Sequence, residues 1–339
     1  MTARDPVVSV LIPVLDEEAS IRATVAAMRD QRVEGGHELL FLDGRSEDRT
    51  RAILEALAGE DPRVRVLDNP ARRVPQALNV GLRAARGEFV ARMDAHTFYP
   101  PDYLACGVER LRRGDVEWVA GPQVPRASGP WSRRVALALG SRLGVGGASF
   151  RRIGEREHEA DSGFTGVWRR VTLESHGGWD EDWPVNQDSE LGARIRARGG
   201  RIVCVPEMAA GYVPRDSVRS LARQYWRYGQ YRAKTSGRHP ASMRRSHLVP
   251  PALLATLAAA LLPGRAGRPF RVGSAAYGVA LLATAVASLG RARPRADAAF
   301  VPLLLATMHV TWAAGFLAGS MRFGPPLEAI ARVLAVRGR

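Results

Sequence analysis

Acidic residues recur in this sequence directly after short apolar runs. Asp16 and Glu17 follow the first run, Asp43 follows the second, and Asp94 with His96 follows the fourth. Carboxylates placed together repel a phosphorylated ligand unless a divalent cation such as Mg²⁺ or Mn²⁺ lies between them, with substrate phosphates completing its ligand shell. Asp94 and His96 are the candidate ligands of that cation, although His96 is equally consistent with an ordinary hydrogen-bonding histidine.

These residues need a scaffold that brings them together, and the apolar runs supply one. Short apolar runs alternate with segments of helical pattern over the first 120 residues, which predicts an α/β chain with a mainly parallel sheet flanked by helices. Ligands bind such a sheet beyond the carboxyl ends of its strands, where the acidic residues fall. The expected strands are 7–12, 37–42, 64–67, 88–93 and 118–120, and the expected helices are 20–31, one ending near 58, 75–85 and 101–113.

Two classes of nucleotide-binding protein are excluded by their missing motifs. No Gly-x-Gly-x-x-Gly follows the first expected strand, and no Walker A lysine motif is present, so neither a dinucleotide oxidoreductase nor a P-loop NTPase is expected. The two cysteines, Cys106 and Cys204, are too few for a disulfide scaffold or a cysteine-rich zinc module. They fit a reducing cytosol.

The positive charge is concentrated in the last 140 residues. Residues 1–200 hold 29 basic and 30 acidic side chains, whereas residues 201–339 hold 20 basic and 4 acidic ones, giving the net charge of +15. A nucleic-acid-binding protein usually carries its charge on the folded domain, and here that domain is neutral. The basic residues flank apolar segments, which favours an anionic membrane surface and no nucleic acid as partner.

Three apolar stretches predict a helical membrane region over 248–321, followed by a basic tail over 322–339. The stretch 249–262 is short, 272–289 has no charged residue, and 298–321 has none either. A spanning helix needs about 20 apolar residues, so we expect two or three transmembrane helices, with buried core helices as the alternative. No signal peptide is expected. The basic block before Leu248 predicts a catalytic domain in the cytoplasm, on the inner (plasma) membrane.

Residues 217–235 predict an amphipathic helix. Apolar residues recur at helical spacing, and arginines form a second stripe at intervals of four. The apolar stripe is Val218, Leu221, Ala222 and Tyr225, and the basic stripe is Arg219, Arg223 and Arg227. We interpret the segment as an interfacial helix whose aromatic rings suit the headgroup layer and whose arginines can bind a diphosphate. An ordinary solvated basic face is the alternative.

In their order along the chain, these motifs resemble family 2 glycosyltransferases, which have a GT-A fold. The resemblance covers residues from about 7 to about 230 and is closest to the succinoglycan-type exopolysaccharide branch. It is carried by VSVLIP with DEE, DGRSEDRT, ALNVG, GEFVARMDAH, and GGWDE with QDSEL. The segment ending in Asp94 resembles the strand that leads into the family's Asp-x-Asp motif, although His96 stands where the family often has the second aspartate. The resemblance implies a nucleotide-diphospho-sugar transferase fold over residues 1–235.

The resemblance also implies roles for particular residues. Pro13, Asp16 or Glu17, and Asp43 would contact the nucleotide of the donor. Asp94 would lie at its diphosphate and metal, and Asp188 would be the general base. Residues 224–228 are similar to the Gln-x-x-Arg-Trp motif of processive synthases, which makes Gln224, Trp226 and Arg227 candidates for the acceptor diphosphate.

The implied reaction moves a sugar from a nucleotide-diphosphate donor to a polyprenyl-diphosphate-linked saccharide in cell-surface polysaccharide synthesis. A divalent cation stabilises the departing diphosphate, and one carboxylate deprotonates the acceptor hydroxyl, so a single displacement inverts the anomeric centre. One alternative is a polyprenyl-phosphate sugar synthase, for which no base is essential. The other is a non-catalytic membrane scaffold whose α/β domain only binds a ligand.

Overall fold

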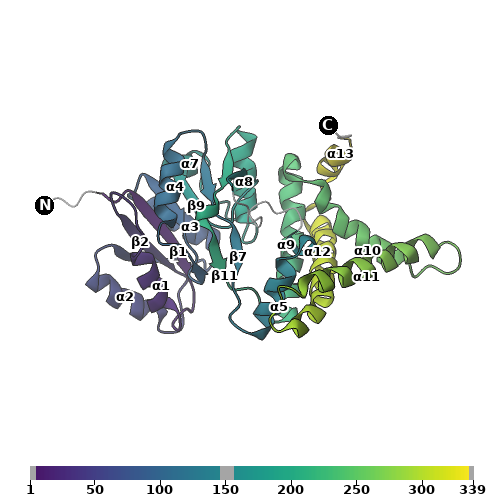
Figure 1. The fold of residues 1–339 in the computed structure, drawn as a ribbon. Helices are drawn as coiled ribbons and strands as arrows, with labels where there is room; N and C mark the ends of the chain where they lie inside the picture. The colour runs from purple at the N-terminus through teal and green to yellow at the C-terminus, as the bar shows by residue number, and fades with distance from the viewer. Residues whose placement is uncertain (1–4, 146–155, 336–339) are drawn as a thin grey trace. The chain divides into compact units, whose positions relative to one another are not determined.

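The computed structural model describes residues 5–145 and 156–335 (Figure 1). They fall into two units, each formed by two stretches of the chain. The first unit comprises Met1–Val124 and Ser149–Tyr212, and the second comprises Pro125–Ala148 and Val213–Arg339.

An eight-stranded mixed sheet organises the first unit, in the order β3-β2-β1-β4-β9-β6-β10-β8. The first four strands of that order are parallel, as are β6 and β10, while β9 runs antiparallel to both of its neighbours and β8 antiparallel to β10. The sheet is therefore mostly parallel, as the alternation of strands and helices predicts. The strands are β1 Val8–Val14, β2 His37–Asp43, β3 Val64–Asp68, β4 Phe89–Arg92, β6 Trp118–Ala120, β8 His158–Glu159, β9 Gly166–Arg169 and β10 Ile202–Cys204.

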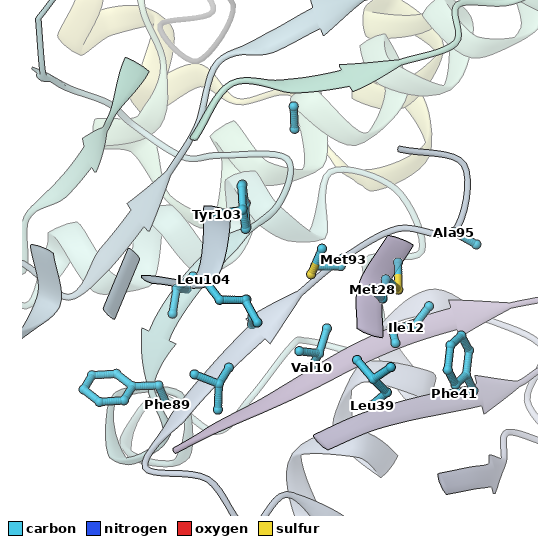
Figure 2. Close-up of a cluster of buried hydrophobic side chains, with 14 of the residues drawn as sticks. Val10, Ile12, Met28, Leu39, Phe41, Phe89, Met93, Ala95, Tyr103 and Leu104 are labelled. Carbon is cyan, nitrogen blue, oxygen red and sulfur yellow. The ribbon is translucent and has the colours of Figure 1, made fainter. Parts of the chain in front are cut away.

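Helices cover both faces of this sheet because successive strand residues point to opposite sides. On one face, Val10 and Ile12 of β1 pack with α1, α2 and α4 (Figure 2). On the other, Leu11 of the same strand packs with α3, α7 and α8. The helices are α1 Ile21–Arg29, α2 Thr50–Glu60, α3 Val74–Ala84, α4 Tyr103–Arg112, α7 Arg170–Ser175 and α8 Gln187–Ala197.

A second sheet of three very short strands has the order β5-β11-β7. Its strands are β5 Thr97–Phe98, β7 Gln123–Pro125 and β11 Ala210–Tyr212. Strands of two or three residues are too short to show an alternating pattern, so this sheet is not predicted from the sequence. Its first strand fixes the chain just after Asp94 and His96, which the sequence singles out.

The second unit is helical, and its closest helix pair is α9 with α12. The two helices run in the same direction, with Gly315 of α12 against Trp226 of α9 and Gly319 against Gln230. Gly229 of α9 in turn meets the α12 backbone at Trp312. The helices are α5 Pro130–Leu139, α6 Arg142–Val145, α9 Val218–Arg238, α10 Val249–Ala259, α11 Arg268–Ser288, α12 Val301–Phe323 and α13 Leu327–Ala335.

Two helical segments in the described residues are long and apolar enough to cross a membrane, Arg268–Ser288 and Arg295–Phe323. The first apolar stretch forms α10, which has 11 residues and falls short of the length that a span requires. Asp297, just before α12, is buried and accepts hydrogen bonds from Arg133 and Arg134 of α5, which ties α5 to the start of α12.

Two helical glycines of the first unit predict opposite effects of the same substitution. At Gly59 of α2 an added Cβ meets nothing within 4 Å, so Gly59→Ala gains helix propensity and raises the free energy of unfolding by about 0.5–1 kcal/mol. At Gly107 of α4 it lies 2.5 Å from a methyl carbon of Val167, so Gly107→Ala lowers that free energy by about 1–3 kcal/mol. Urea unfolding followed by tryptophan fluorescence measures both. Equal stability of the two variants would contradict this packing.

Candidate functional site

The guanidinium of Arg92 joins two of the carboxylates that the sequence singles out. Its Nε donates to Asp94 Oδ1 at 2.8 Å, and its Nη2 donates to Asp94 Oδ2 at 3.1 Å. Its Nη1 donates to Asp188 Oδ1 at 2.7 Å. Asp94 and Asp188 are 94 positions apart in the sequence, and this one side chain places them together at the carboxyl end of β4.

Secondary structure fixes all three side chains. Arg92 is the last residue of β4 and lies between Leu11 of β1 and Gly166 of β9. Asp94 lies two residues later, and its backbone N–H donates to the Tyr99 hydroxyl at 2.7 Å. Asp188 is the second residue of α8, where the helix dipole favours a negative charge.

Burial changes the protonation chemistry of this trio. The Arg92 side chain is 7% exposed and that of Asp188 is 17% exposed. Removal from water raises the pKa of Asp188 to about 6, an effect that the Arg92 charge opposes and the nearby Asp94 charge reinforces. Burial works against the charged form of Arg92, but the two carboxylates outweigh it and hold the pKa of Arg92 above its ordinary value.

The loops after β1 and β2 are hydrogen-bonded to each other at the same edge of the sheet. Asp16, in a left-handed backbone conformation, accepts the N–H of Glu47 at 2.7 Å, and its own N–H donates to the Ser46 hydroxyl. The N–H of Glu17 donates to the Thr50 hydroxyl at 2.7 Å. The two loops thus form one rigid rim.

Asp43 and Pro13 lie at the ends of β2 and β1, directly beside this rim. The Asp43 side chain is fully buried, one carboxylate oxygen accepts from the Ser46 hydroxyl at 2.6 Å, and the other faces Arg51. Pro13 lies within β1, half-buried and paired with Leu42 of β2. Both residues lie at the edge where the sequence places them, and Asp43 shapes the loop from inside.

His96 faces Glu17 across the rim. Its Nδ1 lies 2.9 Å from Glu17 Oε1, and its ring is 68% exposed, while Glu17 is largely buried. Burial disfavours the charged form of Glu17, but the hydrogen bond and charge of His96, with a further bond from Ser20, lower the pKa of Glu17 below its ordinary value. This pair connects the loop after β1 with the loop after β4.

The donor atoms fit a cation that is bound together with phosphate groups. In the described ranges, no three His, Cys, Asp or Glu side chains gather as a ready-made metal cluster. Asp94 is 25% exposed and has lone pairs beyond those that Arg92 uses. A carboxylate behind the imidazole, as Glu17 stands behind His96, is the usual support of a metal-binding histidine. Asp94 and His96 are therefore the candidates for part of a ligand shell that a substrate's oxygens would complete.

Gln224, Trp226 and Arg227 all lie on α9, in the second unit. The Gln224 side chain donates to the Tyr228 hydroxyl at 3.0 Å, and Arg227 and Trp226 are exposed. The helix is amphipathic as expected, because Leu221 and Tyr225 of the apolar stripe are buried.

Sequence reasoning missed Arg92, although one signal for it was present. The segment Phe89–Met93 is apolar except for this arginine. A charged residue in the central strand of a sheet is buried only with partners, and the two candidate carboxylates were the available ones. The roles of Ser46 and Thr50 left no comparable signal, because hydroxyl residues are common in any loop.

Comparisons with known proteins agree with this fold. The family model described as glycosyl transferase family 2 matches residues 9–172. The succinoglycan biosynthesis protein ExoA of Rhizobium meliloti is 33% identical over 315 residues, which cover 91% of this chain and 93% of that protein. An undecaprenyl-phosphate 4-deoxy-4-formamido-L-arabinose transferase of Pseudomonas aeruginosa is 32% identical over 146 residues, covering 41% of this chain and 43% of that protein.

Among solved structures, a mannosyltransferase of Pyrobaculum calidifontis in complex with GDP-Man and Mn²⁺ aligns with a TM-score of 0.52. It is 21% identical, and the alignment covers 98% of this chain and 88% of that chain, which shows a shared GT-A fold. With the long match to the succinoglycan protein and the family model over the mixed sheet, the chain belongs to glycosyltransferase family 2 and is a transferase enzyme.

Proposed function

We propose that this enzyme transfers a sugar, with inversion, from a nucleotide-diphosphate donor to a lipid-linked saccharide in exopolysaccharide synthesis. The observation that carries the proposal is the joining of Asp94 and Asp188 by Arg92, because it sets a donor-side carboxylate beside a candidate base. The similarity to a succinoglycan biosynthesis protein over nine-tenths of the chain supports the exopolysaccharide role. The GDP-Man complex of the mannosyltransferase supports a nucleotide-sugar donor.

The chain's own residues divide the chemistry between donor and acceptor. The rim of Pro13, Asp16 and Glu17, with Asp43 as its internal support, holds the nucleotide. When bound at Asp94 and His96, a divalent cation supplies Lewis-acid stabilisation of the departing diphosphate. Carboxylate donors suit both Mg²⁺ and Mn²⁺, and Mn²⁺ is the cation in the complex of the similar mannosyltransferase.

Asp188 acts as the general base on the acceptor side. Arg92 engages its Oδ1, and we assign Oδ2 to take the proton from the acceptor hydroxyl as that oxygen attacks the anomeric carbon. The sugar–phosphate bond breaks in the same displacement, and the electron pair leaves with the diphosphate. One base and one displacement reverse the configuration at the anomeric carbon.

The acceptor is proposed to be a polyprenyl-diphosphate-linked saccharide held at the inner membrane, with the first unit in the cytoplasm. The two long apolar helices and the basic flanking residues support a membrane location. The exposed Arg227 of α9, with Gln224 and Trp226, offers donors and a ring suited to a diphosphate at headgroup level. We keep as a proposal the predicted division into a catalytic part over 1–235, a membrane part over 248–321 and a basic tail over 322–339, although the compact units place Pro125–Ala148 and the chain from Val213 onward together.

A second candidate is a polyprenyl-phosphate sugar synthase. The undecaprenyl-phosphate transferase among the relatives favours it, although that similarity covers less than half of each chain. A lipid phosphate is already ionised, so this reaction needs no base. Because the family consists of transferases, the alternative of a non-catalytic scaffold no longer applies.

Removing the base distinguishes the two reactions. Membranes containing the protein are incubated with radiolabelled nucleotide sugars, and label is followed into the lipid extract. Asp188→Asn is expected to lower transfer at least 100-fold, because general base catalysis contributes about that much, while nucleotide affinity is retained. The matched control is Glu174→Gln, an exposed carboxamide substitution on the neighbouring helix α7, which keeps full activity. Unchanged transfer by Asp188→Asn into a lipid phosphate would establish the second candidate.

The rate is expected to depend on the protonation of Asp188. Because burial raises its pKa to about 6, the carboxylate is ionised above that pH and protonated below it. The charged groups that face it are Arg92 and Asp94. The rate under single-turnover conditions should therefore level off above pH 6 and fall about tenfold per pH unit below it. A rate that stays flat down to pH 4.5, in a protein that remains folded, would contradict the assignment.

Removal of metal tests the donor set at the rim. A chelator should abolish transfer, and added Mn²⁺ should restore it. In His96→Ala, half-maximal activity should need at least tenfold more Mn²⁺, because losing a ligand or its support weakens metal sites by about 10- to 100-fold. His158→Ala, at a histidine of the edge strand β8, serves as the control. Identical Mn²⁺ dependence of His96→Ala and the unmodified enzyme would remove His96 from the site.

A further inference from the structure

The proposed reaction gives Arg92 no direct chemical role, yet this residue contacts both candidate carboxylates. It occupies the last position of a central strand, where side chains are normally apolar, and its guanidinium is almost fully buried. Three of its N–H groups bind three carboxylate oxygens of Asp94 and Asp188. A buried ion pair often stabilises a fold no more than apolar residues of similar volume would. Stability alone therefore does not explain the presence of Arg92 at this position.

We propose that Arg92 is a positioning residue, which holds the donor-side carboxylate of Asp94 and the acceptor-side carboxylate of Asp188 in one fixed arrangement. The inference rests on the proposed function, because it gives Asp188 its orientation as base. In this proposal Arg92 acts through these two side chains and not by contact with a substrate.

The shape of the guanidinium explains why an arginine serves here. Its edge formed by Nε and Nη2 matches the two oxygens of Asp94, and Nη1 remains in the same plane for Asp188. The contact therefore fixes both the distance and the relative orientation of the two carboxylates. A lysine carries the same charge on a single rotating ammonium group, which imposes no common plane.

The backbone adds the rigidity that this role requires. Arg92 pairs with Leu11 of β1 on one side and Gly166 of β9 on the other, so its Cα lies inside the sheet. Asp188, by contrast, comes from a helix start preceded by Asn186 in a left-handed conformation. Arg92 thus fixes the position of Asp188, which lies on a helix, relative to the sheet that positions Asp94.

The charge balance points the same way. Without Arg92, the two carboxylates at the same buried edge would repel each other, and this repulsion would favour side-chain orientations that separate them. With it, the trio carries one net negative charge. The positive charge of Arg92 therefore keeps the carboxylates of Asp94 and Asp188 together, although they would repel each other without it.

The first test compares Arg92→Met with Arg92→Lys. Arg92→Met should lower kcat about 100-fold, since misplacement of a reacting group by about 1 Å costs that much. Arg92→Lys should restore the unfolding temperature because the charge is kept, but leave kcat at least tenfold low because the planar fork is lost. Full recovery of kcat by Arg92→Lys would overturn the proposal, because charge alone would then suffice.

A matched control is available in the same unit. Arg110 of α4 is also buried and also joins two carboxylates, Asp115 and Glu157. Asp115 precedes β6, at the opposite edge of the sheet from Asp94. Arg110→Met should lower the unfolding temperature, yet keep kcat within about threefold of the unmodified enzyme. An equal loss of kcat in both methionine variants would show a general effect of instability and overturn the proposal.

A double-mutant cycle tests whether Arg92 acts through Asp188. In the Asp188→Asn background, Arg92→Met should lower the residual rate less than about threefold, because the group it positions is already gone. A full 100-fold further loss would mean an independent role and would contradict the proposal.

Nucleotide affinity separates failure of this inference from failure of the proposed function. UDP and GDP are titrated calorimetrically with Mn²⁺ present. Arg92→Met should weaken the binding of whichever nucleotide binds by about tenfold, because it frees Asp94, while Arg110→Met changes nothing. If the unmodified protein transfers no sugar, the proposed function fails, and the affinity decides on Arg92 alone. Unchanged affinity in Arg92→Met would then overturn the inference.

Discussion

A buried guanidinium must keep its partners, and the placement of Asp94 and Asp188 at the carboxyl end of β4 depends on this constraint. Removing one partner from a buried ion pair costs about 3–5 kcal/mol, because the remaining charge has neither water nor a counter-charge. Arg92 cannot leave the sheet, since it belongs to its central strand. Asp94 and Asp188 therefore have to come to it, and residues 94 positions apart in the sequence share one location.

The rim on the other side of the first strand follows a different physical rule. There the backbone N–H groups of the loops after β1 and β2 find side-chain acceptors in each other's loop, such as Asp16 with Glu47 and Ser46 with Asp16. These hydrogen bonds satisfy backbone groups that would otherwise need another partner. The loops after β1 and β2 are thus held by hydrogen bonds to each other, and Asp94 and Asp188 are held by an ion pair with Arg92.

The sequence predicts the scaffold better than the site. Short apolar runs such as 37–42 alternate with helical segments, and their carboxyl ends mark the edge where Asp43 and Asp94 fall. The sequence does not predict which way a side chain turns within a loop. Asp43 points inward because the Ser46 hydroxyl and Arg51 lie there, a choice made by tertiary packing. Arg92 is not predicted as a site residue because a single charge in an apolar run does not by itself indicate which groups it binds.

The close pairing of α9 with α12 constrains how the second unit meets a membrane. Gly315 and Gly319 let the α9 backbone approach at Trp226 and Gln230, so the two helices lie side by side over the later part of α12. The exposed face of α9 carries Arg227, and neighbouring turns carry further arginines. Exposed arginines avoid hydrocarbon and remain at headgroup level or in water. If this unit enters a membrane, as proposed, the exposed face of α9 therefore stays outside the hydrocarbon layer.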